Sequence, residues 1–135
     1  MAQHTAIDWE PLLEAAKAAT TRAYVPYSGY RVGAAALVDG GRLVSGCNVE
    51  NASFGVTLCA ECTMVGELMM GGGGRLSAFV CVDARGEVIM PCGRCRQLLA
   101  EHAGEGFVMQ TPAGVRTLEE ILPLAFTKAD MDALA

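Results

Sequence analysis

The sequence predicts an α/β fold in which helices cover both faces of a mixed β-sheet. Segments with the spacing of amphipathic helices alternate with short runs of β-forming residues. One pair of these runs flanks residues 39–41 (DGG), a hairpin signal that makes two of the strands antiparallel. The nearly continuous apolar run at residues 76–83 is typical of a strand that is buried on both faces. Such a strand needs helices on each side of its sheet.

The first half of the chain contains one helix and the hairpin. A helix is expected over residues 7–24, where Leu12, Leu13 and Ala16 recur at helical spacing and Asp8 can cap the N-terminus. The sequence PYSG at residues 26–29 then breaks the chain. The two hairpin strands are expected on either side of residues 39–41, at 30–38 and 42–49.

The second half alternates helices with buried strands. A helix over residues 58–70 is expected to end at the four glycines 71–74, before the buried strand 76–83. Pro91 opens a further helix, and two Thr-x-x-acidic patterns indicate capping boxes of short helices. These later elements are a helix at 92–102, a strand at 106–110, a helix at 117–122 and a terminal helix that begins near residue 127.

Composition and charge exclude several classes of protein. The 135 residues, 14.1 kDa, form a single expected domain, residues 1–135. With 52% hydrophobic and 19% charged residues the chain is not disordered. A net charge of −5 argues against a nucleic acid polymer as partner. No apolar run reaches the ~20 residues of a membrane span, and residues 1–10 lack a secretory signal pattern, so we expect no membrane partner and a cytoplasmic location.

The cysteines carry most of the chemical information. In a reducing compartment, cysteine patterns indicate metal binding or catalysis before disulfides. Four of the six cysteines form two Cys-x-x-Cys motifs, at residues 59–62 and 92–95. Each motif lies where a helix is expected to begin, and the unpaired N–H groups of a helix start stabilise thiolates. Two such helix starts that meet at one point would form a zinc site.

Three interpretations of these motifs compete. All four cysteines could close a structural zinc site, or Cys92 and Cys95 could act as a redox dithiol, which leaves the other pair without a role. In the third interpretation three thiolates hold a catalytic zinc with an open position for water, and Glu61 carries protons. Glu61 favours this interpretation because a structural site has no need of it. Cys-x-Glu followed by Pro-Cys-x-x-Cys is also the signature of zinc deaminases.

Beyond these motifs, the chain resembles the small, homotetrameric cytidine deaminases in register over about residues 9–127. The matching segments are 24–28 (YVPYS), 30–35 (YRVGAA), 46–55 (GCNVENASFG), 91–97 (PCGRCRQ) and 122–126 (LPLAF). The resemblance implies a three-layer α/β/α sandwich with a mixed five-stranded sheet. It also implies zinc-dependent hydrolysis of cytidine, with deoxycytidine as a further expected substrate, to uridine or deoxyuridine and ammonia in pyrimidine salvage.

The resemblance implies a role for each residue that matches the family. Cys59, Cys92 and Cys95 match the zinc ligands, one Zn²⁺ per subunit, and Glu61 matches the proton shuttle. The substrate would be a small nucleoside bound at the boundaries between subunits of a homotetramer.

Five further residues match positions that bind this nucleoside. Asn48 and Glu50 match residues that hold the ribose hydroxyls, and Tyr30 matches an aromatic residue that packs on the pyrimidine ring. Ala60 matches a position whose backbone N–H contacts the keto oxygen of the base. Phe126 matches an aromatic residue that reaches into the site of a neighbouring subunit.

The chain also departs from the family at three positions. Cys62 stands where most members have an arginine that hydrogen-bonds the ligand sulfurs, so Arg94 or Arg96 is the hypothetical replacement donor. Tyr30 and Phe54 stand where the family more often has Phe and Tyr, respectively.

Two alternative functions stay open at the level of the sequence. A blasticidin-type deaminase shares the zinc motifs, although residues 48–51 (NVEN) favour cytidine. A small zinc-stabilised binding domain, with all four cysteines closed around the metal, would not be an enzyme.

Overall fold

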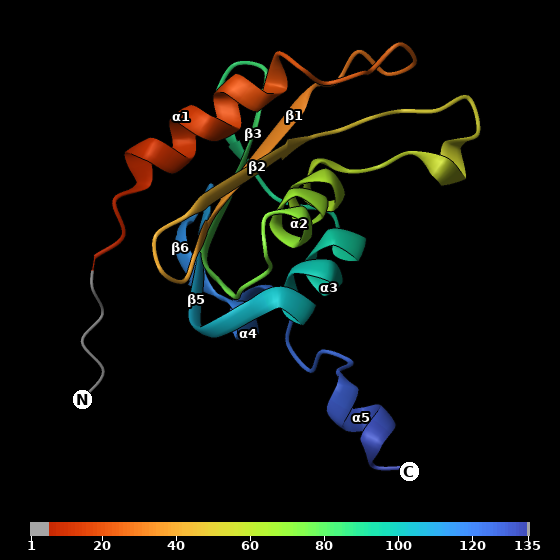
Figure 1. The fold of residues 1–135 in the computed structure, drawn as a ribbon. Coiled ribbons are helices and arrows are strands. Elements are labelled where there is room, and N and C mark those ends of the chain that lie inside the picture. Colours follow the sequence, from red (N-terminus) through yellow and green to blue (C-terminus); the bar gives the residue numbers. More distant parts are fainter. Residues whose placement is uncertain (1–5, 135) are drawn as a thin grey trace.

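A mixed β-sheet forms the middle layer of the structure (Figure 1). The computed structural model describes residues 6–134 of the chain. Within them, five strands lie in the order β2-β1-β3-β5-β6. Only the β3–β5 pair is parallel; the other neighbours along this row are antiparallel. A two-residue strand, β4, pairs with β3 beyond the end of β5. The strands are β1 (Val32–Val38), β2 (Leu43–Cys47), β3 (Leu76–Asp83), β4 (Val88–Ile89), β5 (Ala103–Thr111) and β6 (Gly114–Thr117).

Helices cover both faces of this sheet, as expected for the α/β/α sandwich. On β3, Ala78, Val80 and Val82 pack with α1, whereas Phe79 and Cys81 belong to the core under α2 and α3. The terminal helix α5 extends away from the sheet (Figure 1). No helix of residues 6–134 combines the length and apolarity that crossing a membrane requires. The helices are α1 (Trp9–Thr20), η1 (Phe54–Val56), α2 (Ala60–Met70), α3 (Gly93–His102), α4 (Leu118–Ile121) and α5 (Lys128–Asp132).

Most expected elements are present, and the differences lie at their ends. The strand predicted at 76–83 has these bounds, and both predicted capping boxes are formed. Asp8 caps α1 as expected, but the helix ends at Thr20, not near residue 24. The reason is tertiary: the Arg31 guanidinium donates to the carbonyls of Thr20 and Ala23, and Tyr24 pairs with Val49 instead of continuing the helix. The short elements η1, β4 and β6 were not predicted from the sequence.

The first turn of α2 lies unusually close to β2. A Cβ atom on Gly46 would come within 2.4 Å of the Ala60 carbonyl oxygen and of the Met64 nitrogen. The Thr63 hydroxyl, in turn, accepts a hydrogen bond from the Cys47 N–H (2.9 Å) and donates one to the Cys47 carbonyl (2.7 Å). Glycine at position 46 therefore lets the start of α2 sit directly on the strand that leads to residues 48–50.

Substitution of Gly46 tests this close approach. We expect Gly46→Ala to lower the free energy of unfolding by about 1–3 kcal/mol, because the added methyl group overlaps backbone atoms of α2 that cannot move independently. Gly66→Ala is the matched control. Gly66 lies inside α2 with open space around it, so alanine there should raise stability by about 0.5–1 kcal/mol. Chemical denaturation measures both; equal stability of the two variants would contradict the proposed contact.

Candidate active site

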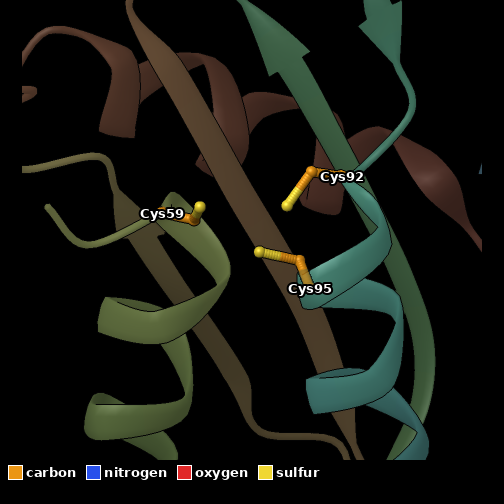
Figure 2. Close-up of side chains that lie close together, drawn as sticks. All are labelled: Cys59, Cys92 and Cys95. Atoms are coloured by element: carbon orange, nitrogen blue, oxygen red, sulfur yellow. The ribbon is translucent and has the colours of Figure 1, made fainter. Parts of the chain in front are cut away.

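Three cysteine side chains meet where α2 and α3 begin (Figure 2). Cys59 is the N-cap residue of α2, Cys92 is the N-cap residue of α3, and Cys95 lies in the first turn of α3. Their sulfur atoms all lie within 4.8 Å of one another. Sulfur ligands of a tetrahedral zinc lie about 3.8 Å apart, given Zn–S bonds of about 2.3 Å. The donor set and its spacing therefore fit zinc.

The electrostatics of the three thiols also favour a bound cation. Burial raises the pKa of Cys59, and that of Cys95 is raised by burial and by the adjacent Glu61. Burial also acts to raise the pKa of Cys92, but hydrogen bonds from Cys95 and Cys59 outweigh it and hold this pKa below the ordinary value. Crowded, partly buried thiolates need a positive charge nearby. The two helix N-termini provide part of it, and a divalent cation would provide the rest.

Cys62 does not belong to this group. It lies one residue after Glu61 on α2, and its sulfur is outside the cluster of potential metal-ligating atoms found among residues 6–134. The closed four-cysteine site considered from the sequence is therefore not formed. The redox interpretation concerned Cys92 and Cys95. These two cysteines form no disulfide in the structure, and both lie beside Cys59 as free thiols.

Glu61 is a buried carboxyl group beside the thiols. It is the second residue of α2 and is only 3% exposed, yet it is not one of the clustered ligand atoms. Burial raises the pKa of Glu61, although a hydrogen bond with Cys95 acts in the opposite direction. A raised pKa makes a carboxyl group a stronger base, which helps it to accept a proton and later return it. Its position matches what a proton carrier next to a metal requires.

A cavity of about 290 Å³ opens onto this group. Its wall includes Cys59, Cys92 and Glu61, together with three of the residues predicted to bind the substrate. These three are Tyr30, Asn48 and Ala60. The structure thus gathers most of the predicted site from the loop before β1, the segment after β2 and the start of α2.

Two predicted substrate-binding residues lie outside this cavity. Glu50 lines an adjoining cavity of about 360 Å³, which shares Thr57 with the first. Phe126 is 60% exposed on the far side of α3, where its carbonyl accepts a hydrogen bond from Gln97 (2.8 Å). Contact of Phe126 with the site of a neighbouring subunit stays a prediction.

The sequence did not place Cys81 at the site. Cys81 lies in the strand 76–83 that was predicted to be buried, and it is 1% exposed, but it also lines the cavity. Its thiol donates a hydrogen bond to the Ile89 carbonyl (3.1 Å), which joins β3 to the segment before Cys92. The alternation of β3 could have placed Cys81 on the same face as Phe79, toward α2 and α3.

Of the two arginines expected near the sulfurs, one is engaged elsewhere. The Arg96 guanidinium donates to the carbonyls of Pro91 (3.0 Å) and Ile121 (3.3 Å). It therefore supports the turn before Cys92 and joins it to the end of α4. Arg94 is exposed on the first turn of α3. Arg94 and the remaining N–H groups of Arg96 stay the hypothetical replacement donors.

The fold and the site together define a zinc-dependent hydrolase, and comparison with known proteins identifies its family. Residues 8–111 match the cytidine and deoxycytidylate deaminase zinc-binding region. A Mycobacterium tuberculosis cytidine deaminase is 55% identical over 125 residues, which are 93% of this chain and 94% of that protein. The crystal structure of a cytidine deaminase from M. tuberculosis superposes with a TM-score of 0.86 at 56% identity, covering 90% of this chain and 99% of that one.

A relative with a different name also matches. A blasticidin-S deaminase from Bacillus cereus is 30% identical over 129 residues, 86% of this chain and 92% of that protein. The chain belongs to the cytidine and deoxycytidylate deaminase family. It carries the zinc-binding region of that family, with Cys59, Cys92 and Cys95 as the clustered thiols. The resemblance and the α/β fold class with a mixed sheet between helices are confirmed. The sheet of the described residues has six strands and not the expected five, because the short β4 also pairs with β3.

Paired serine substitutions test the ligand set. We expect Cys62→Ser to retain one zinc per chain, because its sulfur lies outside the cluster. Cys95→Ser should weaken zinc binding by more than about 100-fold, since loss of a ligand costs more than the 10–100-fold typical of groups that only support ligands. Zinc content after dialysis against a chelator, measured by atomic emission, checks both variants. Loss of zinc from Cys62→Ser would instead support the interpretation in which all four cysteines bind the metal.

Proposed function

We propose that this chain hydrolyses cytidine and deoxycytidine to uridine or deoxyuridine and ammonia, in the cytoplasm and as a step of pyrimidine salvage. The observation that carries the proposal is the buried Glu61 carboxyl beside three clustered thiols at one cavity. A structural metal site would have no use for such a group. The relatives named cytidine deaminase support the choice of base and sugar.

Glu61 would move the protons of the reaction. Bound by the three thiolates, zinc supplies a Lewis acid that makes water nucleophilic at neutral pH. Glu61 accepts the proton of the attacking water and passes it to the ring nitrogen at position 3. The oxygen of that water would bond to the carbon at ring position 4. Glu61 then takes the remaining proton of the added hydroxyl group and gives it to the amino group, so that the C–N bond breaks, a carbonyl forms at position 4 and ammonia leaves. One carboxyl group can serve as base and then acid because burial raises its pKa.

The other predicted residues would hold the nucleoside. Tyr30 at the cavity wall would pack on the pyrimidine ring. The N–H of Ala60, in the first turn of α2, has no partner within its helix and is available to the keto oxygen of the base. Asn48 and Glu50 would hold the sugar hydroxyls. The Glu50 carboxylate would also repel a phosphate, which favours a free nucleoside over a nucleotide.

We further propose that the chain works as a homotetramer with its sites at subunit boundaries. Two groups of large apolar side chains are exposed on the single chain, and exposed apolar groups of this kind can form contacts between subunits. One group lies around η1 and the other in the C-terminal segment. The group around η1 consists of Tyr24, Tyr27, Phe54, Val56 and Leu58. The C-terminal group consists of Leu124, Phe126, Met131 and Leu134.

Deamination of blasticidin S is the second candidate. It is favoured by the 30% identity to the B. cereus enzyme and uses the same zinc motifs. The higher identity to the M. tuberculosis cytidine deaminase favours cytidine. Parallel assays with the two nucleosides decide between them.

Ammonia release is the direct test of the reaction. We expect the zinc-loaded protein to release ammonia from cytidine. Glu61→Ala should lose at least about 10³-fold in kcat, because Glu61 is the only carboxyl group among the described residues that line the cavity. Glu61→Ala should keep its zinc, since Glu61 is not among the clustered ligand atoms. Release from blasticidin S but not from cytidine would select the second candidate. Full activity of Glu61→Ala would refute the role of Glu61.

Subunit mixing tests the shared site. Phe126→Ala and Glu61→Ala chains should each be nearly inactive alone. If Phe126 completes the site of a neighbour, co-refolding the two variants should restore roughly a quarter of the sites, because some then pair an intact Glu61 with an intact Phe126. Light scattering reports whether four chains assemble. Failure of the mixture to regain activity, with tetramers formed, would show that Phe126 does not complete the site of a neighbouring subunit.

A further inference from the structure

The Ser28 hydroxyl connects two residues of the predicted nucleoside site. It donates a hydrogen bond to Glu50 Oε2 and accepts one from the Tyr30 N–H (3.0 Å). The other carboxylate oxygen, Glu50 Oε1, accepts from the backbone N–H groups of Tyr27 (3.0 Å) and Ser28 (3.1 Å). The loop before β1 thus folds around the Glu50 side chain, and Ser28 provides two of its three donors.

The same loop is tied to the first cavity through Asn48. The Asn48 side-chain amide donates to the Tyr30 carbonyl (2.8 Å), and its oxygen accepts from the Val32 N–H (3.0 Å). Tyr30 is therefore held at both ends of its backbone, by Ser28 on one side and by Asn48 on the other. Gly29, with φ of +68°, allows the turn that brings the Tyr30 N–H onto the Ser28 oxygen.

These bonds leave little freedom to the Glu50 carboxylate. An ionised carboxylate has about four lone-pair positions, and three of them are occupied by Tyr27 and Ser28. The hydrogen bond from Ser28 is also the main reason why the pKa of Glu50 lies below its ordinary value, so the group is an acceptor only. The remaining position is on Oε2, the oxygen that Ser28 holds. The direction of the Ser28 O–H bond therefore decides where that lone pair points.

Ser28 and Glu50 line the adjoining cavity, which shares Thr57 with the cavity beside the clustered thiols. A nucleoside whose base lies beside Glu61 would extend its sugar toward this second cavity. We propose that Ser28 is a positioning residue that aims the free lone pair of Glu50 at the sugar hydroxyls, and that it thereby sets the preference for hydroxylated sugars. This inference rests on the proposed function in taking a nucleoside as the substrate.

A ratio of two substrates tests the inference. The selectivity is the kcat/KM for cytidine divided by that for 2′,3′-dideoxycytidine, which lacks both hydroxyls that Glu50 would bind. We expect Ser28→Ala to lower this ratio about tenfold, because a hydrogen bond to a charged group is lost and Glu50 is no longer aimed. Ser28→Thr keeps the hydroxyl and should restore the ratio. In a Glu50→Gln background, Ser28→Ala should change it less than about twofold, since Ser28 acts through Glu50.

Ser77→Ala is the matched control. The Ser77 hydroxyl donates to the Leu37 carbonyl (3.1 Å) at the end of β3 remote from the cavity, so its loss should leave the ratio unchanged. If Ser28→Ala does not fold, Ser28→Cys, with similar volume and a weaker donor, takes its place. An unchanged ratio in a folded Ser28 variant overturns the inference. A wild-type protein that deaminates neither nucleoside refutes the proposed function instead.

Discussion

The site depends on the meeting of two helix N-termini on one face of the sheet. Cys59 and Cys92 occupy the N-cap positions of α2 and α3, and each leaves the first N–H groups of its helix without a side-chain cap. These N–H groups and the positive ends of the helix dipoles stabilise thiolates. Three clustered sulfurs, of which only that of Cys95 is fully buried, lie beside the buried Glu61 carboxyl group, and such positive ends together with a cation stabilise their negative charges.

The sheet brings the two helix starts together. The strand β3 lies in the centre and carries Cys81 under the cavity, while α2 rests on β2 through the Gly46 contact. The parallel pairing of β3 with β5 requires a crossover connection, and α3 is part of that connection. Both helices therefore begin at the same edge of the sheet. Glu61 follows Cys59 by two residues, so the fold that positions the ligand also buries the proton carrier.

The two halves of the site are built differently. Helix starts, which are rigid, hold the groups that would carry out the chemistry. The nucleoside side is formed by the loop before β1 and the segment after β2, joined by hydrogen bonds from Ser28 and Asn48. Ser28 and Asn48 bind the backbone of Tyr30 and not its side chain. The presence of Tyr at position 30, where the family more often has Phe, therefore leaves these hydrogen bonds intact. The chemistry is then fixed by the helices, while the choice of sugar is open to variation in the loops.

The sequence alone determined the fold class, the central strand and the chemical identity of the site, because hydrophobic periodicity, caps and motif spacing are local properties. The motifs at residues 59–62 and 92–95, with Glu61, favoured a catalytic zinc site, and the wider resemblance to the cytidine deaminases implied the reaction. The tertiary structure decided what depends on contacts between distant segments. It separated Cys62 from the three clustered sulfurs, occupied Arg96 with carbonyls, and ended α1 at Thr20 through Arg31. It also joined Ser28 to Glu50, 22 residues apart, by bonds that spacing alone does not reveal.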